Sequence, residues 1–169
     1  MARSELLVVG VDGSEASARA LRWALDEGRR RGAQVHAIMA WKSHAVLGGP
    51  APVLLRPELA PHHLREQHWQ DLNRVVRSCL GGASTPEVHA ELVEGEAAEV
   101  LTDRSAGAAM LVLGNRGHGR VADAVQASTA LRCIHRARSP VLVVPSGMAR
   151  AGTGAAEPDE VAAIDPVLG

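Results

Sequence analysis

Five short apolar runs, separated by longer amphipathic segments, organise this chain. Leu6–Val9 and Ala109–Gly114 are almost continuous in leucine and valine, which is typical of strands covered on both faces in a parallel sheet. Three further strands are predicted at Gln34–Trp41, Pro86–Gly95 and Ser139–Pro145. The pattern therefore predicts five strands, of which the first and fourth are the most buried.

Helical periodicity fills the intervals between these runs. The first helix follows an N-cap at Ser14, places Leu21, Ala24 and Leu25 on one stripe, and ends at Gly32. Further helices are predicted at about His62–Cys79, Glu96–Ala106 and Ser128–Arg136. Strands that alternate with helices form right-handed βαβ units, so we predict an open, mostly parallel α/β sheet with helices on both faces.

The organisation along the chain is that of one domain. Residues 1–145 hold all the predicted elements, whereas the small, polar and acidic segment 146–169 is predicted to be a disordered tail. Glycines and prolines across Ser43–Pro61 predict a long loop between the second strand and the second helix.

Composition and charge exclude several classes of function. A net charge of −1 and the lack of Phe and Tyr disfavour nucleic-acid binding. No apolar run is long enough to cross a membrane and no signal-peptide pattern is present, so we expect a cytoplasmic protein with no membrane partner. Cys79 and Cys133 lack CxxC spacing and are interpreted as reduced, buried thiols.

Candidate chemistry gathers where the first and fourth strands end. Both end in glycine-bearing turns, "GVDGS" and "GNRGHG", and ligands of doubly wound sheets bind beyond the carboxyl ends of the strands. Gly114, Gly117 and Gly119 would let the backbone approach an anion closely. Asp12, at the end of the first strand, is placed to accept a hydrogen bond from a ribose hydroxyl.

Charged and hydroxyl side chains strengthen the interpretation of this loop as a phosphate site. Ser128 and Thr129 are expected to begin a helix whose N-terminal amides favour phosphate. Charge-assisted donors in the loop are Arg116, His118 and Arg120. Other nucleotide motifs are absent from the sequence: the only lysine is Lys42, and the glycines read GxxGxG rather than GxGxxG.

Structural interpretations of the same residues remain open. Asp12, Gly13 and Ser14 also fit a simple turn and helix cap, and the glycine loop also fits a plain connection. His36 and His89 lie within strands and are interpreted as structural. We assign no metal site, because neither His62 nor His63 stands four residues from His68, the usual spacing of helical ligands.

The chain resembles the universal stress protein family. Members pair an early aspartate with a glycine, two residues, a second glycine, nine residues, a third glycine and a hydroxyl residue. Here the frame falls on Asp12 and on Gly114, Gly117, Ala127 and Ser128, and the likeness extends over about Glu5–Pro145. It implies strand order 3-2-1-4-5 in a Rossmann-like, adenine-nucleotide-hydrolase-like three-layer sandwich.

The resemblance also implies a ligand, since members that carry the full loop motif bind ATP. It assigns ATP, with or without Mg²⁺, or another adenine nucleotide, to a site that includes the backbone near Ala40. The implied site residues are Gly10, Val11, Asp12, Ala40, Gly114, Asn115, Arg116, Gly117, His118, Gly119, Arg120, Ala127, Ser128 and Thr129. Ala127 departs from the motif: a position that needed positive φ would cost alanine about 1 kcal/mol, whereas a purely spatial requirement would tolerate the methyl group.

Two classes of function follow, with a third as a weaker alternative. The chain is expected to be a nucleotide-binding regulatory module, or a dimeric scaffold that needs no nucleotide, or at most a slow ATPase, because no catalytic triad or kinase signature is present. The family dimerises through the last strand, so a homodimer through Val141–Val144 and an unidentified protein partner are expected. Gly114→Ala and Asp12→Ala are predicted to weaken ATP binding and to leave the fold intact.

Overall fold

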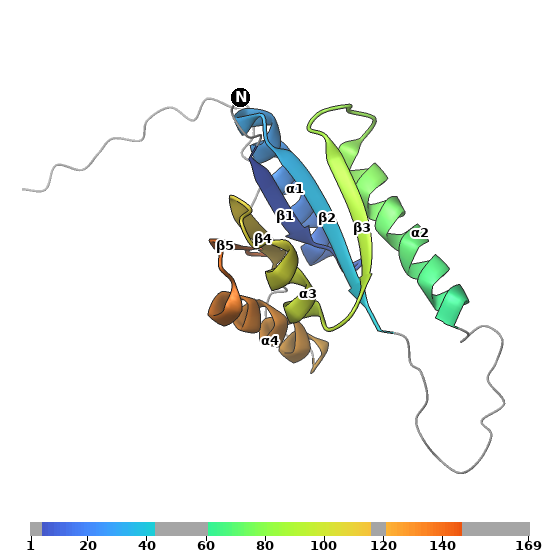
Figure 1. Ribbon diagram of the computed structural model, residues 1–169. Helices are drawn as coiled ribbons and strands as arrows, with labels where there is room; N and C mark the ends of the chain where they lie inside the picture. The colour runs from blue at the N-terminus through green and yellow to red at the C-terminus, as the bar shows by residue number, and fades with distance from the viewer. Residues whose placement is uncertain (1–4, 43–60, 116–120, 147–169) are drawn as a thin grey trace, which may run out of the picture.

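The computed structural model describes residues 5–42, 61–115 and 121–146, without the side chains of residues 61 and 121–128. These ranges form a three-layer α/β structure in which strands and helices alternate (Figure 1). The strands are β1 (Leu6–Gly10), β2 (Gln34–Trp41), β3 (Val88–Glu94), β4 (Met110–Gly114) and β5 (Val141–Val144). The helices are α1 (Glu15–Arg31), α2 (Pro61–Leu80), α3 (Ala97–Arg104) and α4 (Val121–Arg136).

The sheet has the predicted topology. Its order is β3-β2-β1-β4-β5 and every recorded pair is parallel, so the strand order and fold class expected from the sequence are confirmed. β1 lies at the centre, with Val8 opposite both His36 of β2 and Leu111 of β4. The order reverses between β1 and β4, because β2 follows β1 on one side and β4 flanks it on the other. This switch point is where a ligand of such a sheet binds.

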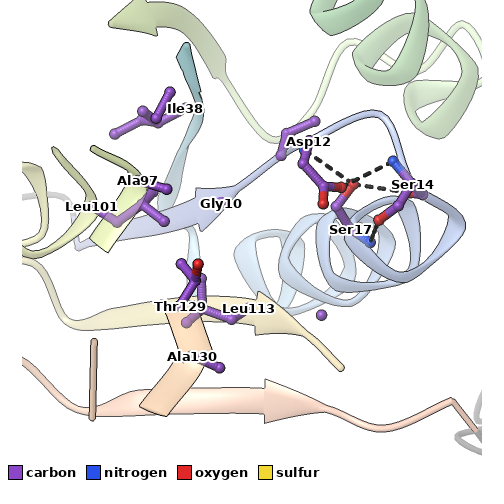
Figure 2. Close-up of a pocket in the computed structure, with 13 residues that line it drawn as sticks. Gly10, Asp12, Ser14, Ser17, Ile38, Ala97, Leu101, Leu113, Thr129 and Ala130 are labelled. Carbon is purple, nitrogen blue, oxygen red and sulfur yellow. Dashed lines mark hydrogen bonds between the residues drawn. The ribbon is translucent and has the colours of Figure 1, made fainter. Parts of the chain in front are cut away.

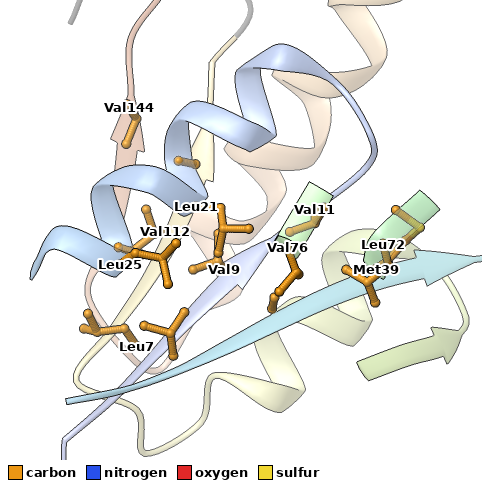
Figure 3. Close-up of a cluster of buried hydrophobic side chains, with 14 of the residues drawn as sticks. Leu7, Val9, Val11, Leu21, Leu25, Met39, Leu72, Val76, Val112 and Val144 are labelled. Atoms are coloured by element: carbon orange, nitrogen blue, oxygen red, sulfur yellow. The ribbon is translucent and has the colours of Figure 1, made fainter. Parts of the chain in front are cut away.

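Two apolar clusters cover the two faces of the sheet. The larger cluster joins β1, β2 and β4 to α1 and α2 through fully buried residues such as Leu7, Leu21 and Leu72 (Figure 3). The smaller cluster lies under α3 and α4 and includes Val8 and Ile38. Alternate residues of a strand point to opposite faces, which is why the nearly continuous apolar runs of β1 and β4 can serve both clusters.

Helix α1 begins and ends as its sequence predicts. Ser14 is the N-cap and its Oγ accepts a hydrogen bond from the backbone N–H of Ser17, 3.1 Å away. Gly32 ends the helix in the left-handed conformation, with φ of 64°, which a residue with a side chain rarely adopts. No helix in the described ranges is both long enough and apolar enough to cross a lipid bilayer.

Helix α4 differs from the prediction, because it begins at Val121 and not near Ser128. The segment Val121–Ala127 contains three alanines and no glycine or proline, so its helix propensity carries the helix back almost to Gly119. Ser128 and Thr129 therefore lie inside α4 rather than at its N-terminus. The expectation that they present free helix-terminal amides to a phosphate is wrong, and that property belongs to the residues near Val121.

The predicted loop at residues 43–60 and the predicted tail at residues 147–169 lie outside the described residues. The division into a domain over residues 1–145 and a disordered tail therefore stays a prediction.

Candidate functional site at the switch point

A pocket of about 150 Å³ lies at the carboxyl ends of β1 and β4, between the start of α1 and helices α3 and α4 (Figure 2). Its walls come from six separate elements and the turns that follow them. The lining residues are Gly10, Val11, Asp12, Ser14, Ser17, Ile38, Ala40, Ala97, Leu101, Leu113, Gly114, Thr129 and Ala130. The sequence-predicted residues Gly10, Val11, Asp12, Ala40, Gly114 and Thr129 are therefore brought together.

One end of the pocket is polar and is built on the turn between β1 and α1. Asp12 Oδ1 accepts a hydrogen bond from the backbone N–H of Ser14 at 2.9 Å, and the Asp12 N–H donates to Ser17 Oγ at 3.3 Å. Ser17 Oγ in turn donates to the Ser14 carbonyl at 2.9 Å (Figure 2). The turn-and-cap interpretation of this segment is thus confirmed, and it holds the exposed Asp12 carboxylate at the pocket.

The opposite end of the pocket is apolar. Ile38 and Ala40 of β2 form one wall, and Ala97 and Leu101 of α3 face them. Leu113 of β4 extends the apolar surface toward α4. Flat apolar rings suit such a surface, since pockets for small molecules combine apolar walls with a few placed polar groups.

Glycine is required at position 114 for a structural reason that the sequence did not suggest. A Cβ at this position would lie 2.2 Å from the carbonyl oxygen of Ala16 and 2.9 Å from the backbone nitrogen of Ser17. The N-terminal turn of α1 therefore packs directly on β4, and only glycine allows that approach. The prediction that Gly114→Ala leaves the fold intact is contradicted by this contact, so that variant is not a clean probe of ligand binding.

Asn115 connects β4 to its neighbours and does not line the pocket. Its backbone N–H donates to the carbonyl of Val144 at 2.9 Å, and its carbonyl accepts from Arg19 Nη2 at 3.3 Å. The point at which the chain leaves β4 is thereby tied to β5 on one side and to α1 on the other. Arg19 was missed in the sequence because nothing local marks it as a partner of a residue 96 positions away.

The remaining predicted residues of the glycine loop cannot be placed. Arg116, Gly117, His118, Gly119 and Arg120 lie outside the described residues. Ala127 and Ser128 fall within α4, although their side chains are not described. A helical position has negative φ, so Ala127 does not meet the backbone strain that a positive φ would impose.

Ion pairs hold α3, the helix that forms part of the apolar wall. Glu96 caps its N-terminus by accepting from the N–H groups of Ala98 and Glu99, and its other oxygen lies 2.9 Å from Arg132 of α4. At the other end of α3, Arg104 contacts Glu91 of β3 with distances of 2.8–3.1 Å. That pairing lowers the pKa of Glu91.

His36 of β2 lies beside the same carboxylate, with Nε2 at 2.9 Å from Glu91 Oε2, and its ring packs 4.8 Å from that of His89. Burial lowers the pKa of His36, an effect that Glu91 partly opposes and that His89 and Arg104 reinforce. The imidazole is therefore mainly neutral at neutral pH.

Sequence reasoning missed seven lining residues, of which Ser14 had been predicted only as a helix cap: Ser14, Ser17, Ile38, Ala97, Leu101, Leu113 and Ala130. All but the two serines are apolar residues on predicted elements, and an apolar pocket wall has the same sequence pattern as a core position. Ser17 could have been found from its place three residues after the N-cap Ser14, where the two hydroxyls can exchange hydrogen bonds with the backbone.

Comparison with known proteins agrees with this geometry. A universal stress protein of Mycolicibacterium smegmatis is 32% identical over 139 residues, which are 82% of this chain and 47% of that protein. The chain thus spans about half the length of the curated relatives it matches.

Two solved structures show the same fold at lower identity. A universal stress protein in complex with cAMP aligns with a TM-score of 0.62 and 20% identity, covering 84% of this chain and 97% of that one. A universal stress protein from Archaeoglobus fulgidus in complex with dAMP aligns with a TM-score of 0.52 and 22% identity, covering 85% and 98%. The model of the universal stress protein family matches residues 5–145, and this chain belongs to that family.

Proposed function

We propose that the pocket at the switch point binds an adenine nucleotide, with ATP as the ligand and with or without Mg²⁺. The observation that carries the proposal is the arrangement of the pocket, which has apolar walls from β2 and α3 at one end and the Asp12 carboxylate at the other, with Gly114 and Thr129 also in its lining. The two related structures with bound cAMP and dAMP support an adenine nucleotide as the class of ligand.

Each part of the nucleotide has a matching surface in this proposal. The adenine ring lies between Ile38 and Ala40 on one side and Leu101 on the other. The ribose hydroxyls donate to the Asp12 carboxylate, whose Oδ1 also accepts a hydrogen bond from the backbone N–H of Ser14. The phosphates extend past Gly114, and the sequence that follows β4, residues 116–120, contains two arginines and a histidine that can donate hydrogen bonds to them.

The proposed role is regulatory, in a cytoplasmic response to stress, with little or no hydrolysis. Catalysis of ATP hydrolysis needs a positioned water and stabilisation of the transition-state charge. Among the described pocket residues, Asp12 is the one carboxylate, and it already accepts a hydrogen bond from Ser14. Occupancy of the pocket would therefore act as a signal to a protein partner.

We include in the proposal a homodimer formed through β5. This strand pairs with β4 on one side and, within the described residues, with no strand on the other. Leu131 and Ile134 lie three residues apart on the neighbouring helix α4 and are 55% and 52% exposed. An unpaired edge strand beside exposed apolar side chains suits pairing with a second copy of the chain.

The dimer is tested by light scattering after size-exclusion chromatography. Leu131→Asp combined with Ile134→Asp should convert a dimer into a monomer that keeps its circular dichroism spectrum. Trp69→Ala is the matched control, because Trp69 is also exposed but lies on α2. A wild-type protein that elutes as a monomer at all concentrations would reject this part of the proposal.

A nucleotide-independent scaffold is the competing function, since the departure of Ala127 from the family motif is a feature of this sequence. The two are distinguished by calorimetric titration with Mg-ATP, AMP, cAMP and adenosine. Micromolar binding of ATP would support the module, and a lack of heat up to millimolar nucleotide would support the scaffold.

Asp12→Asn is the decisive variant in that titration. The amide retains an oxygen that can accept from Ser14 but loses the negative charge that binds ribose hydroxyls, so affinity should fall by about tenfold. Asp26→Asn on α1 removes a carboxylate that pairs with Arg29 away from the pocket, and it should bind as the wild type does. Equal affinity of the Asp12 variant and the wild type would place the ribose elsewhere.

A further inference from the structure

A charged cluster behind the pocket joins the two elements that form its apolar end. Arg104, the last residue of α3, places Nη2 at 2.8 Å from Glu91 Oε1 and Nε at 3.1 Å from both carboxylate oxygens. Glu91 Oε2 also lies 2.9 Å from His36 Nε2 on β2. Contacts therefore run from α3 across β3 to β2.

Each member of this cluster is close in the chain or in register to a pocket wall. Glu91 is the register partner of Ile38 on the neighbouring strand. His36 precedes Ile38 by two residues and so faces the same side of the sheet. Arg104 lies one turn beyond Leu101 of α3. The cluster therefore connects the β2 wall to the α3 wall immediately outside the pocket.

The spacing between these walls determines what the slot can hold. A planar base gains dispersion energy only where both of its faces meet atoms at about 3.5–4 Å, and a gap of even 1 Å forfeits much of it. Helix α3 is eight residues long and turns only part of its surface toward the sheet. A two-pronged arginine–carboxylate contact fixes orientation as well as distance, which a few apolar contacts do not.

We propose that Glu91 and Arg104 are positioning residues that set the width of the slot between α3 and β2, and thereby its affinity for the purine base. This inference rests on the proposed function, because it assigns the apolar end of the pocket to the base. It adds a requirement outside the loop motif: the charge pair on β3 and α3 must be intact for the base to bind tightly.

Removal of either charge is the direct test. Glu91→Gln and Arg104→Gln should each weaken the binding of adenosine, AMP and ATP by the same factor, about fivefold, since the three ligands share the base. The ratio of ATP to adenosine affinity should stay as in the wild type. The charge-exchanged double variant Glu91→Arg with Arg104→Glu should recover most of the lost affinity.

Glu99→Gln is the matched control on the same helix. Glu99 pairs with Arg136 at 3.5 Å, and both side chains are more than half exposed, so solvent screens the pair. This variant should bind all three ligands as the wild type does. Titrations well below each unfolding temperature keep every variant folded, so a change in stability alone would not alter the measured affinity.

The outcomes separate this inference from the proposed function. If both Gln variants bind the ligands as tightly as the wild type does, the positioning role is overturned and the proposed function is not. A loss confined to ATP would also overturn it, because the defect would then concern the phosphates and not the base. A wild-type protein that binds neither adenosine nor ATP would overturn the proposed function, and the positioning role with it.

Discussion

The two helical layers of this protein differ in the size of the apolar cluster that they bury against the sheet. Helices α1 and α2 have 17 and 20 residues and bury a continuous apolar cluster against β1, β2 and β4. Helices α3 and α4 bury a smaller cluster, α3 has only eight residues, and ion pairs join it to β3 and to α4. Ala97, Leu101, Thr129 and Ala130 of this second, thinner layer line the pocket. The comparison indicates that one face of the sheet supplies most of the stability, whereas the other supplies adjustable walls for a ligand.

Truncation of one leucine in each layer tests this contrast and should give the largest effect. Leu25 of α1 is 1% exposed and packs in the larger cluster, so Leu25→Ala should lower the free energy of unfolding by about 3–4 kcal/mol. Leu101→Ala on α3 should cost about 2 kcal/mol, because the adjoining pocket leaves its side chain fewer packing partners.

Urea titration followed by circular dichroism measures both values. Equal losses for the two leucine variants would show that the α3 layer contributes as much stability as the α1 layer, and the contrast would then fail. The Leu101 variant should additionally bind adenosine more weakly, since the side chain lines the slot.

Helix α1 of the larger layer and the strands β1 and β4 on which it packs were the elements predicted most completely from the sequence. Continuous apolar runs marked β1 and β4, and the stripe of Leu21, Ala24 and Leu25 between Ser14 and Gly32 gave α1 almost to the residue. These signals are local, because neighbouring residues alone indicate burial on both faces of a strand and the capping of a helix. The strand order and the meeting of Asp12 with Gly114 followed from the fold that such a pattern and the family resemblance imply.

The thinner layer was predicted less well, for physical reasons that can be named. The start of α4 was placed seven residues late, because Ser128 and Thr129 were interpreted as the beginning of the helix. Leu101 and Ile38 could not be assigned to a pocket, since only the tertiary arrangement separates a pocket wall from a core position. The contact of Arg104 with Glu91 depends on where α3 lies over the sheet, and no local pattern specifies that.

A substitution at Gly114 tests how closely α1 of the larger layer packs on β4 beside the pocket. Gly114→Ala places a methyl group 2.2 Å from the Ala16 carbonyl oxygen. Because that oxygen belongs to the backbone, the clash is relieved only if α1 shifts. We expect a loss of about 2–3 kcal/mol in the free energy of unfolding. Gly10→Ala is the control, because its nearest obstacles are the ends of the Leu113 and Leu101 side chains, which can rotate. A smaller loss at position 114 than at position 10 would contradict the close approach of α1 to β4.

His36 extends the comparison to the charged contacts of the thinner layer. Its pKa is lowered mainly by burial and further by His89 of β3 and Arg104 of α3, with Glu91 acting in the opposite direction; β1 presents the apolar Val8 opposite it. The unfolded chain therefore binds a proton more readily than the native protein. Stability contributed by the neutral imidazole is present above the ordinary histidine pKa of about 6.5, and it is lost as the pH falls below that value.

His36→Gln should therefore flatten the decline in stability between neutral pH and about pH 5.5. Urea midpoints of wild type and variant at these two pH values provide the measurement. His135→Gln removes an exposed histidine from α4 and should retain the wild-type decline. If the His36 variant declines as steeply as the wild type, another group must account for the pH dependence.

The two cysteines allow the smallest effect to be measured, because one thiol lies in each layer. Cys79 of α2 is half-buried, whereas Cys133 of α4 is fully buried, and burial raises its pKa to about 11. Cys133 should therefore react with a thiol reagent at pH 8 mainly when α4 moves away from the sheet.

The salt concentration tests this movement. The pairs Arg132–Glu96 and Arg136–Glu99 hold α4 to α3 and so oppose the opening of α4. Salt screens these pairs, so labelling of Cys133 should accelerate a few-fold between 0.1 and about 1 M NaCl. Labelling of Cys79 should change little, because the α2 layer is apolar where it meets the sheet. The Cys79→Ala and Cys133→Ala variants isolate each rate, and an equal salt response of both thiols would mean that the two layers open together, as one cooperative unit.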